Sequence, residues 1–161
     1  MPDSLICKES RLLPTSEVEE QPRVSREFTF PGDSGSLVRA REAVMDVIKP
    51  YCSGEAEEVD ILIAVQEALA NAVVHGCRGD AGKTIHCRVE VDASAFTITV
   101  RDCGPGFDVE AATQATDPGA NTTTHGRGIA MMRGLMDEVT YRRGGAEVQL
   151  RKKRAEASSA A

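Results

Sequence analysis

Glu67-Ala-Leu-Ala-Asn71 lies inside a longer segment, residues 57–75, whose apolar side chains repeat with the period of an α-helix. At about 3.6 residues per turn, one stripe of this helix is apolar and predicts a face that packs on a sheet: Ile61, Val65, Ala68 and Ala72. Glu67, Asn71 and His75 are spaced i, i+4, i+8 and form a polar row beside that stripe. The spacing alone is more typical of an ordinary solvated helix face than of a site.

A second motif, Asp102-Cys-Gly104-Pro-Gly106, directly follows a predicted strand over residues 95–101. Gly104 and Gly106 permit backbone conformations and close approaches that a side chain would prevent. A buried carboxylate at Asp102 could accept a hydrogen bond from an exocyclic amine such as that of adenine. Such a bond to a charged group contributes about 1.5–3 kcal/mol, enough to select one base. The alternative is a plain turn.

A third motif, Gly126-Arg127-Gly128, precedes a helix predicted over residues 129–136. Backbone N–H groups at a helix start, aided by the helix dipole, form an anion site. The motif is neither a Walker A loop nor Gly-x-Gly-x-x-Gly, and it could also be a simple loop joint.

The remaining periodicities predict an α/β fold, a two-layer α+β sandwich. Strands are expected at residues 26–30, 84–91, 95–101, 139–142 and 146–152, and further helices at residues 37–48, capped by Ser36, and 109–115. Consecutive strands are close enough for hairpins, which favours a mixed, mostly antiparallel sheet with helices on one face. Residues 24–153 form the predicted domain, between a flexible arm at residues 1–23 and a disordered tail at residues 154–161.

The composition excludes several classes of protein. The net charge of −6 disfavours direct nucleic-acid binding, which needs clustered cations. The five cysteines show neither Cys-x-x-Cys spacing nor a disulfide framework, so reduced, packed thiols are expected. The amino terminus does not resemble a signal peptide and no apolar run predicts a membrane span, so a cytoplasmic protein is expected.

The order of the three motifs resembles the N, G1 and G2 boxes of the Bergerat-fold (GHKL) ATPases, which include sensor histidine kinases. Within that superfamily, residues 67–76 and 125–137 most resemble the small anti-sigma-factor serine/threonine kinases of bacterial partner-switching systems. The resemblance covers roughly residues 24–153.

The resemblance implies that ATP lies between the long helix and a lid formed by residues 111–125. It implies that Asn71 binds Mg²⁺ and that Glu67 is the general base toward the attacking hydroxyl. Asp102 would bind adenine, in a pocket shaped by Gly104 and Gly106. The residues of the third motif would contact the phosphates: Gly126, Arg127 and Gly128. Many relatives carry Gly-Thr before the last strand, where this chain has Gly145 and Ala146, which implies lower nucleotide affinity or another group in place of the hydroxyl.

The function implied is a protein serine/threonine kinase that binds a sigma factor or other client and phosphorylates a STAS-domain antagonist. The alternatives are a noncatalytic ATP-binding switch module and a scaffold without nucleotide. Relatives often dimerise through the amino-terminal strand, which makes residues 26–30 the candidate edge of a homodimer.

Overall fold

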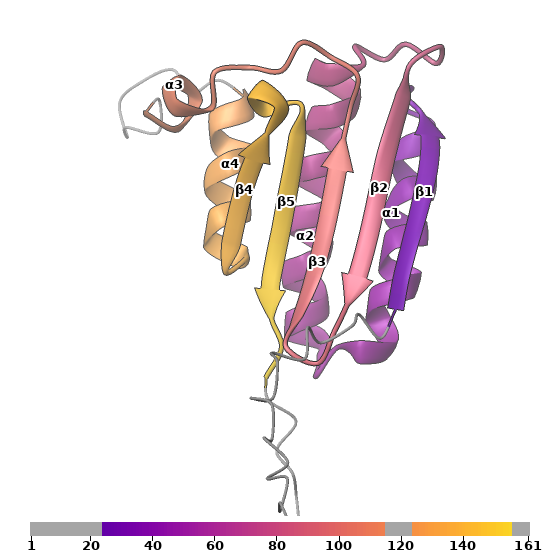
Figure 1. Cartoon of the computed structure of the whole chain (residues 1–161), viewed down its shortest axis with the longest axis vertical. Coiled ribbons are helices and arrows are strands. Elements are labelled where there is room, and N and C mark those ends of the chain that lie inside the picture. Colours follow the sequence, from indigo (N-terminus) through magenta and orange to yellow (C-terminus); the bar gives the residue numbers. More distant parts are fainter. Residues whose placement is uncertain (1–23, 115–123, 156–161) are drawn as a thin grey trace, which may run out of the picture.

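The computed structural model describes residues 24–114 and 124–155, which form a single sheet covered by helices (Figure 1). The sheet has the strand order β1-β2-β3-β5-β4, and every neighbouring pair is antiparallel. Its strands are β1 (Val24–Pro31), β2 (Thr84–Val91), β3 (Ala95–Arg101), β4 (Glu138–Arg142) and β5 (Glu147–Lys153). The antiparallel, two-layer fold is confirmed, and the described strands contain none of the parallel pairs that a mixed sheet allows.

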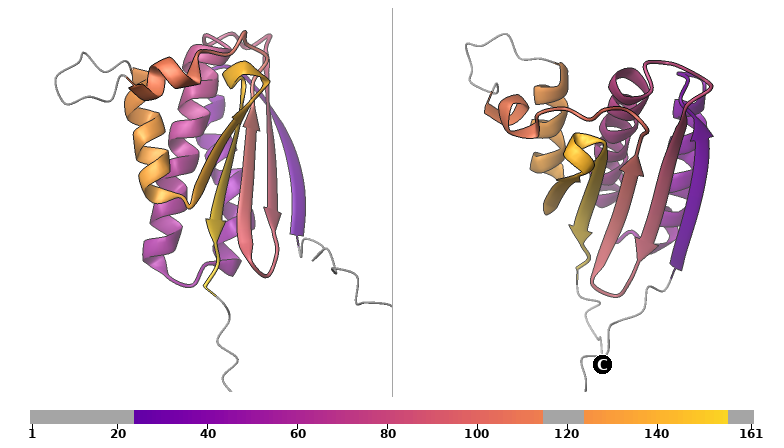
Figure 2. Two further views of the ribbon diagram at one scale, coloured as in Figure 1. Left: turned by 60° about the vertical axis from the view of Figure 1, so that its left-hand side comes forward. Right: turned by 45° about the horizontal axis from the view of Figure 1, so that its top comes forward.

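The three long helices cover one face of the sheet (Figure 2). The helices are α1 (Ser36–Ile48), α2 (Glu55–Asn71), α3 (Val109–Gln114) and α4 (Thr124–Leu135). Short helical turns follow α1 at Lys49–Tyr51, extend α2 as a π-turn at Ala72–Gly76, and join β4 to β5 at Arg143–Gly145. The opposite face of the sheet is polar. Alternate side chains of β2 and β5 lie on it: His86, Arg88, Glu147 and Gln149.

The core lies between the sheet and the helices α1, α2 and α4. The predicted stripe of α2 is buried, with Ile61 and Val65 both 0% exposed, and Phe96, Ile98 and Val100 of β3 face it. The helical stretch Glu55–Gly76 is long and apolar enough to qualify as a membrane span by composition, contrary to the expectation that no run would. Several of its apolar side chains, such as Ile61 and Leu69, belong to the core cluster, whereas Val59 and Val74 are exposed.

Helix starts differ from the sequence prediction in two places. The carboxylate of Asp33 accepts hydrogen bonds from the N–H (3.0 Å) and the hydroxyl (2.8 Å) of Ser36, so Asp33 fixes the turn before α1, while Gly35 occupies the cap position and Ser36 is the first residue of the helix. Helix α4 begins at Thr124, so the Gly126-Arg127-Gly128 motif lies within the helix and not ahead of it.

Some predicted segments fall outside the described residues: the arm at residues 1–23, the part of the lid at residues 115–123, and residues 156–161 of the tail. Arg154, assigned to the tail, is described and well anchored. Its N–H donates to the carbonyl of Ser94 (2.7 Å), and its guanidinium lies 5.4 Å from the ring centroid of Phe96.

Candidate nucleotide-binding site

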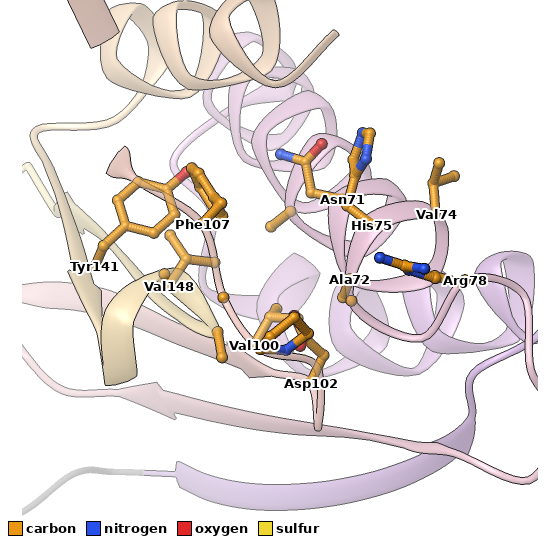
Figure 3. A pocket seen from close by; sticks show the side chains of 16 residues that line it. Asn71, Ala72, Val74, His75, Arg78, Val100, Asp102, Phe107, Tyr141 and Val148 are labelled. Carbon is orange, nitrogen blue, oxygen red and sulfur yellow. The ribbon is translucent and has the colours of Figure 1, made fainter. Parts of the chain in front are cut away.

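A cavity of about 370 Å³ opens between the carboxyl-terminal half of α2 and the ends of β3, β4 and β5 (Figure 3). Three of the predicted site residues line it: Asn71, Asp102 and Gly106. Cavities that hold small ligands in proteins are of about this size, roughly 300–1,000 Å³. The first two motifs, which are distant in sequence, therefore meet at one cavity.

The carboxyl group of Asp102 lies against the last helical turn of the α2 segment. A β-carbon at Gly76 would stand 2.5 Å from Asp102 Oδ1, so the absence of a side chain at Gly76 makes room for the carboxyl group. The backbone N–H of Gly104 donates to Asp102 Oδ1 (2.7 Å) and orients it. Burial raises the pKa of Asp102, while the Gly104 N–H and the charge of Lys83 act in the opposite direction.

The two glycines of the second motif allow close contacts of the backbone. A β-carbon at Gly104 would lie 2.6 Å from the carbonyl oxygen of Gly76. Gly106 has φ +76° and packs against the backbone of Gly144, whose carbonyl carbon would be 2.7 Å from an added β-carbon. Gly104 does not line the cavity; it holds the Asp102 turn against α2.

Helix α4 passes directly over the polar row of α2. A β-carbon at Gly128 would lie 3.0 Å from Glu67 Oε2 and 3.4 Å from Asn71 Nδ2. Glu67 and Asn71 therefore reach the same point of α4, and all three motifs are brought together. Glu67 itself does not line the cavity, and it lies one helical turn before Asn71.

The third motif supplies backbone groups near this point. The first N–H groups of an α-helix have no partner within the helix. Because α4 begins at Thr124, this applies to Gly126, whereas the N–H groups of Arg127 and Gly128 fall within the helical hydrogen-bonding pattern. Gly126 and Gly128 are buried, and Arg127 is exposed.

Two further side chains at the cavity were not singled out by the sequence analysis. The hydroxyl of Tyr141 is buried and has no hydrogen-bond partner among residues 24–114 and 124–155, and its ring makes an edge contact with Phe107 at 5.5 Å between centroids. Burial raises the pKa of Tyr141 to about 12, so the hydroxyl remains a donor at neutral pH. Arg78, with a positive φ of 54°, adds a cation to the lining. Neither residue belongs to a motif, so nothing short of the fold could identify them.

The residues present fit a nucleotide. The cavity combines apolar walls, among them Val100 and Val148, with the carboxyl group of Asp102 and the buried hydroxyl of Tyr141. His75 also lines it, and its side chain is drawn beside Asn71 (Figure 3). Ala146, the position at which the resemblance implies a hydroxyl, is 7% exposed and lies on the same wall. The described residues contain no group of three or more His, Cys, Asp or Glu that could hold a metal ion, so a cation here would depend on the amide oxygen of Asn71 and on phosphate oxygens.

Comparison with known proteins agrees with this geometry. Residues 30–152 match the histidine kinase-like ATPase domain. The chain is 36% identical over 116 residues to the anti-sigma F factor of Halalkalibacterium halodurans, covering 70% of this chain and 78% of the relative. It is 33% identical over 87 residues to the anti-sigma F factors of Anoxybacillus flavithermus and Bacillus thuringiensis, covering 52% of this chain and 58% of each relative. The chain therefore belongs to the histidine kinase-like ATPase family and is related within it to the anti-sigma F factors.

Proposed function

We propose that this protein is an ATP-dependent serine/threonine protein kinase and anti-sigma switch. It binds a sigma factor or another client protein and phosphorylates a STAS-domain antagonist on a hydroxyl side chain. The observation that carries the proposal is the contact of Gly128 in α4 with both Glu67 and Asn71, at the end of the cavity whose other wall holds Asp102.

In this proposal, the base of ATP lies at Asp102. The ionised carboxyl group accepts a hydrogen bond from the exocyclic amine of adenine, and the Gly104 N–H keeps the carboxyl group in position. Gly106 allows the adjoining loop to approach the base closely. The apolar lining, including Val100, packs against the rings of the base and excludes water.

The phosphates lie toward α4. The backbone N–H of Gly126 faces them from the first turn of the helix, and Gly128 keeps the approach free of a side chain. The amide oxygen of Asn71 is the protein ligand to Mg²⁺. When bound, the ion neutralises charge on the phosphate oxygens.

Glu67 is the general base. It lies one helical turn from Asn71, so a Ser or Thr hydroxyl that approaches the terminal phosphate passes within reach of its carboxylate. Glu67 accepts the proton of that hydroxyl as the oxygen attacks phosphorus. Phosphate adds close to two negative charges to the antagonist, which favours its release from the complex.

The names of the relatives support a sigma factor as the client. We place the protein in the cytoplasm, without direct contact with nucleic acid or membrane, in keeping with its net charge of −6. A homodimer is part of the proposal because β1 is an edge strand and a groove of about 520 Å³ runs between β1 and α1, lined in part by Phe28 and Val47.

Phosphoryl transfer tests the proposal. The full chain is incubated with Mg²⁺, γ-labelled ATP and a STAS-domain protein of the same organism. We expect label on a Ser or Thr of the STAS protein, and at least a hundredfold slower transfer by Glu67→Gln with its binding of Mg·ADP retained. Glu42→Gln, which removes an exposed carboxyl group from α1, is the matched control and should transfer at the wild-type rate.

Binding of Mg·ADP without transfer to any STAS protein would contradict the kinase assignment and favour a noncatalytic switch module. The absence of any nucleotide binding would contradict the site itself and leave the scaffold alternative.

A further inference from the structure

Two cysteines lie in adjoining segments beside Asp102, the residue proposed to bind adenine. Cys77 directly follows Gly76, and Cys103 directly follows Asp102, so the contact between Gly76 and Asp102 brings their neighbours together. The thiol of Cys77 donates toward the carbonyl of Thr84 (4.0 Å), and Cys103 is one of the neighbours that shift the pKa of the Cys77 thiol. The two cysteines follow different elements and are distant in sequence, so the sequence analysis did not predict that they would be neighbours.

The backbone leaves no room for another group between these segments. A β-carbon at Gly104 would lie 2.6 Å from the carbonyl oxygen and 2.8 Å from the α-carbon of Gly76. Disulfides form where the α-carbons of two cysteines are about 4.4–6.8 Å apart. The chains immediately beside both cysteines are in contact, as such a bond requires.

The two thiols differ in accessibility. Cys103 is exposed, whereas Cys77 is 0% exposed and packs against the turn before α1, where a β-carbon at Gly32 would lie 2.6 Å from its Sγ. Burial raises the pKa of the Cys77 thiol. An oxidant in solution therefore reaches Cys103 first, and Cys77 is available as the second thiol.

We infer that Cys77 and Cys103 form a reversible disulfide that controls nucleotide binding. With hydrogen peroxide as oxidant, the thiolate of Cys103 attacks one peroxide oxygen, the O–O bond breaks, and a sulfenic acid and water result. The sulfur of Cys77 then attacks the sulfur of Cys103, the S–O bond breaks, and a second water leaves with the thiol proton. In sum, two thiols are oxidised to one disulfide while one peroxide is reduced to two waters, and a dithiol reductant reverses the change.

The disulfide would displace Asp102, the residue proposed to bind adenine. Its length is about 2.05 Å, shorter than any contact between separate sulfur atoms, so the loop of Cys103 must move toward the buried Cys77. Asp102 adjoins Cys103 and is held against Gly76, so its carboxyl group leaves the position set by the Gly104 N–H. We expect oxidation to weaken Mg·ADP binding about tenfold or more, the effect of losing a hydrogen bond to a charged group. This consequence rests on the proposed role of Asp102 in nucleotide binding.

The test uses the full chain carrying Cys7→Ser, because Cys7 lies outside the described residues and could offer another thiol. The protein is treated with hydrogen peroxide, alkylated, digested and analysed by peptide mass spectrometry. We expect a cross-linked peptide joining Cys77 to Cys103, with Cys52 and Cys87 alkylated. Cys87 is a matched buried thiol, which burial keeps protonated by raising its pKa to about 12.

Fluorescent Mg·ADP binding is then measured for the reduced, oxidised and re-reduced protein. Weakened binding after oxidation, restored by dithiothreitol and absent in Cys103→Ser, supports the inference; Cys52→Ser should behave as the parent. No intramolecular cross-link, or a cross-link that leaves binding unchanged, would overturn it. A cross-link in a protein whose reduced form binds no nucleotide would instead overturn the proposed function, and with it the control of binding.

Discussion

The carboxyl group of Asp102 occupies the space that a side chain at Gly76 would need. A β-carbon at Gly76 would lie 2.5 Å from Asp102 Oδ1, and shorter contacts to the other carboxyl atoms make the overlap worse. A glycine at the end of a helix thus sets the position of a carboxyl group on the neighbouring strand.

Gly76→Ala should therefore displace Asp102. We expect Mg·ADP affinity to fall at least tenfold and the free energy of unfolding to fall by about 1–3 kcal/mol, as for overpacked sites. Gly134→Ala is the matched control, since Gly134 is helical, exposed, and has open space around an added β-carbon. It should gain about 0.5–1 kcal/mol and keep its affinity. Calorimetric titration and urea unfolding measure both, and unchanged affinity in Gly76→Ala would contradict the relationship.

Asp102→Asn should bind nucleotide poorly yet be more stable without it. Burial raises the folded-state pKa of Asp102 above its ordinary value of 3.8, so the folded protein holds this proton more tightly than the unfolded chain. The contribution of Asp102 to stability is therefore most favourable below pH 3.8 and is lost as pH rises through the folded-state pKa.

Since asparagine does not titrate, the variant should exceed the wild type in free energy of unfolding at pH 7, and the difference should shrink toward pH 4. Urea unfolding across this range measures it. A less stable variant at pH 7 would mean that the Gly104 N–H and the charge of Lys83 outweigh burial.

Tyr141→Phe should weaken the effect of Mg·ADP without destabilising the nucleotide-free protein. Its buried hydroxyl has no partner in the part of the chain that the structure describes, so its removal should leave the nucleotide-free form equally stable or about 1 kcal/mol more stable. The edge contact with Phe107 is kept. The increase in melting temperature caused by Mg·ADP should be smaller in the variant. A large loss of stability with an unchanged ligand effect would show that the hydroxyl serves the fold and not the nucleotide.

Val47→Asp should weaken the proposed homodimer. Val47 lines the groove beside the edge strand β1, together with Phe28 and Tyr51. Val38, 46% exposed, lies on the opposite side of α1, so Val38→Asp introduces the same charge away from the groove. Sedimentation equilibrium should show a monomer for Val47→Asp and a dimer for Val38→Asp. A monomeric wild type, or equal behaviour of the two variants, would contradict the proposal.

Local patterns predicted the sheet and α2 well. The β2–β3 hairpin has its predicted limits because Asp92 accepts hydrogen bonds from the N–H groups of Ser94 (2.7 Å) and Ala95 (2.8 Å), a turn readable from sequence. The buried stripe of α2 follows from the 3.6-residue period alone. These features depend on neighbouring residues.

The start of α4 was predicted several residues too late for a physical reason. Gly126 and Gly128 disfavour helix in isolation, but Gly128 lets α4 pack against Glu67 and Asn71, and this tertiary contact outweighs propensity. The contact of Gly76 with Asp102 is another such case, because only the folded chain brings these two segments together. The same holds for Cys77 and Cys103, which adjoin these residues.

Calorimetric titration of the full chain with Mg·ADP and with Mg·GDP tests the central claim most directly. Asp102 accepts a hydrogen bond from the amine of adenine and cannot receive one from the carbonyl of guanine, so we predict one Mg·ADP bound per chain with Mg·GDP bound at least tenfold more weakly. Asp102→Asn should remove most of this preference. Equal binding of the two nucleotides by the wild type, or binding of neither, would contradict the account.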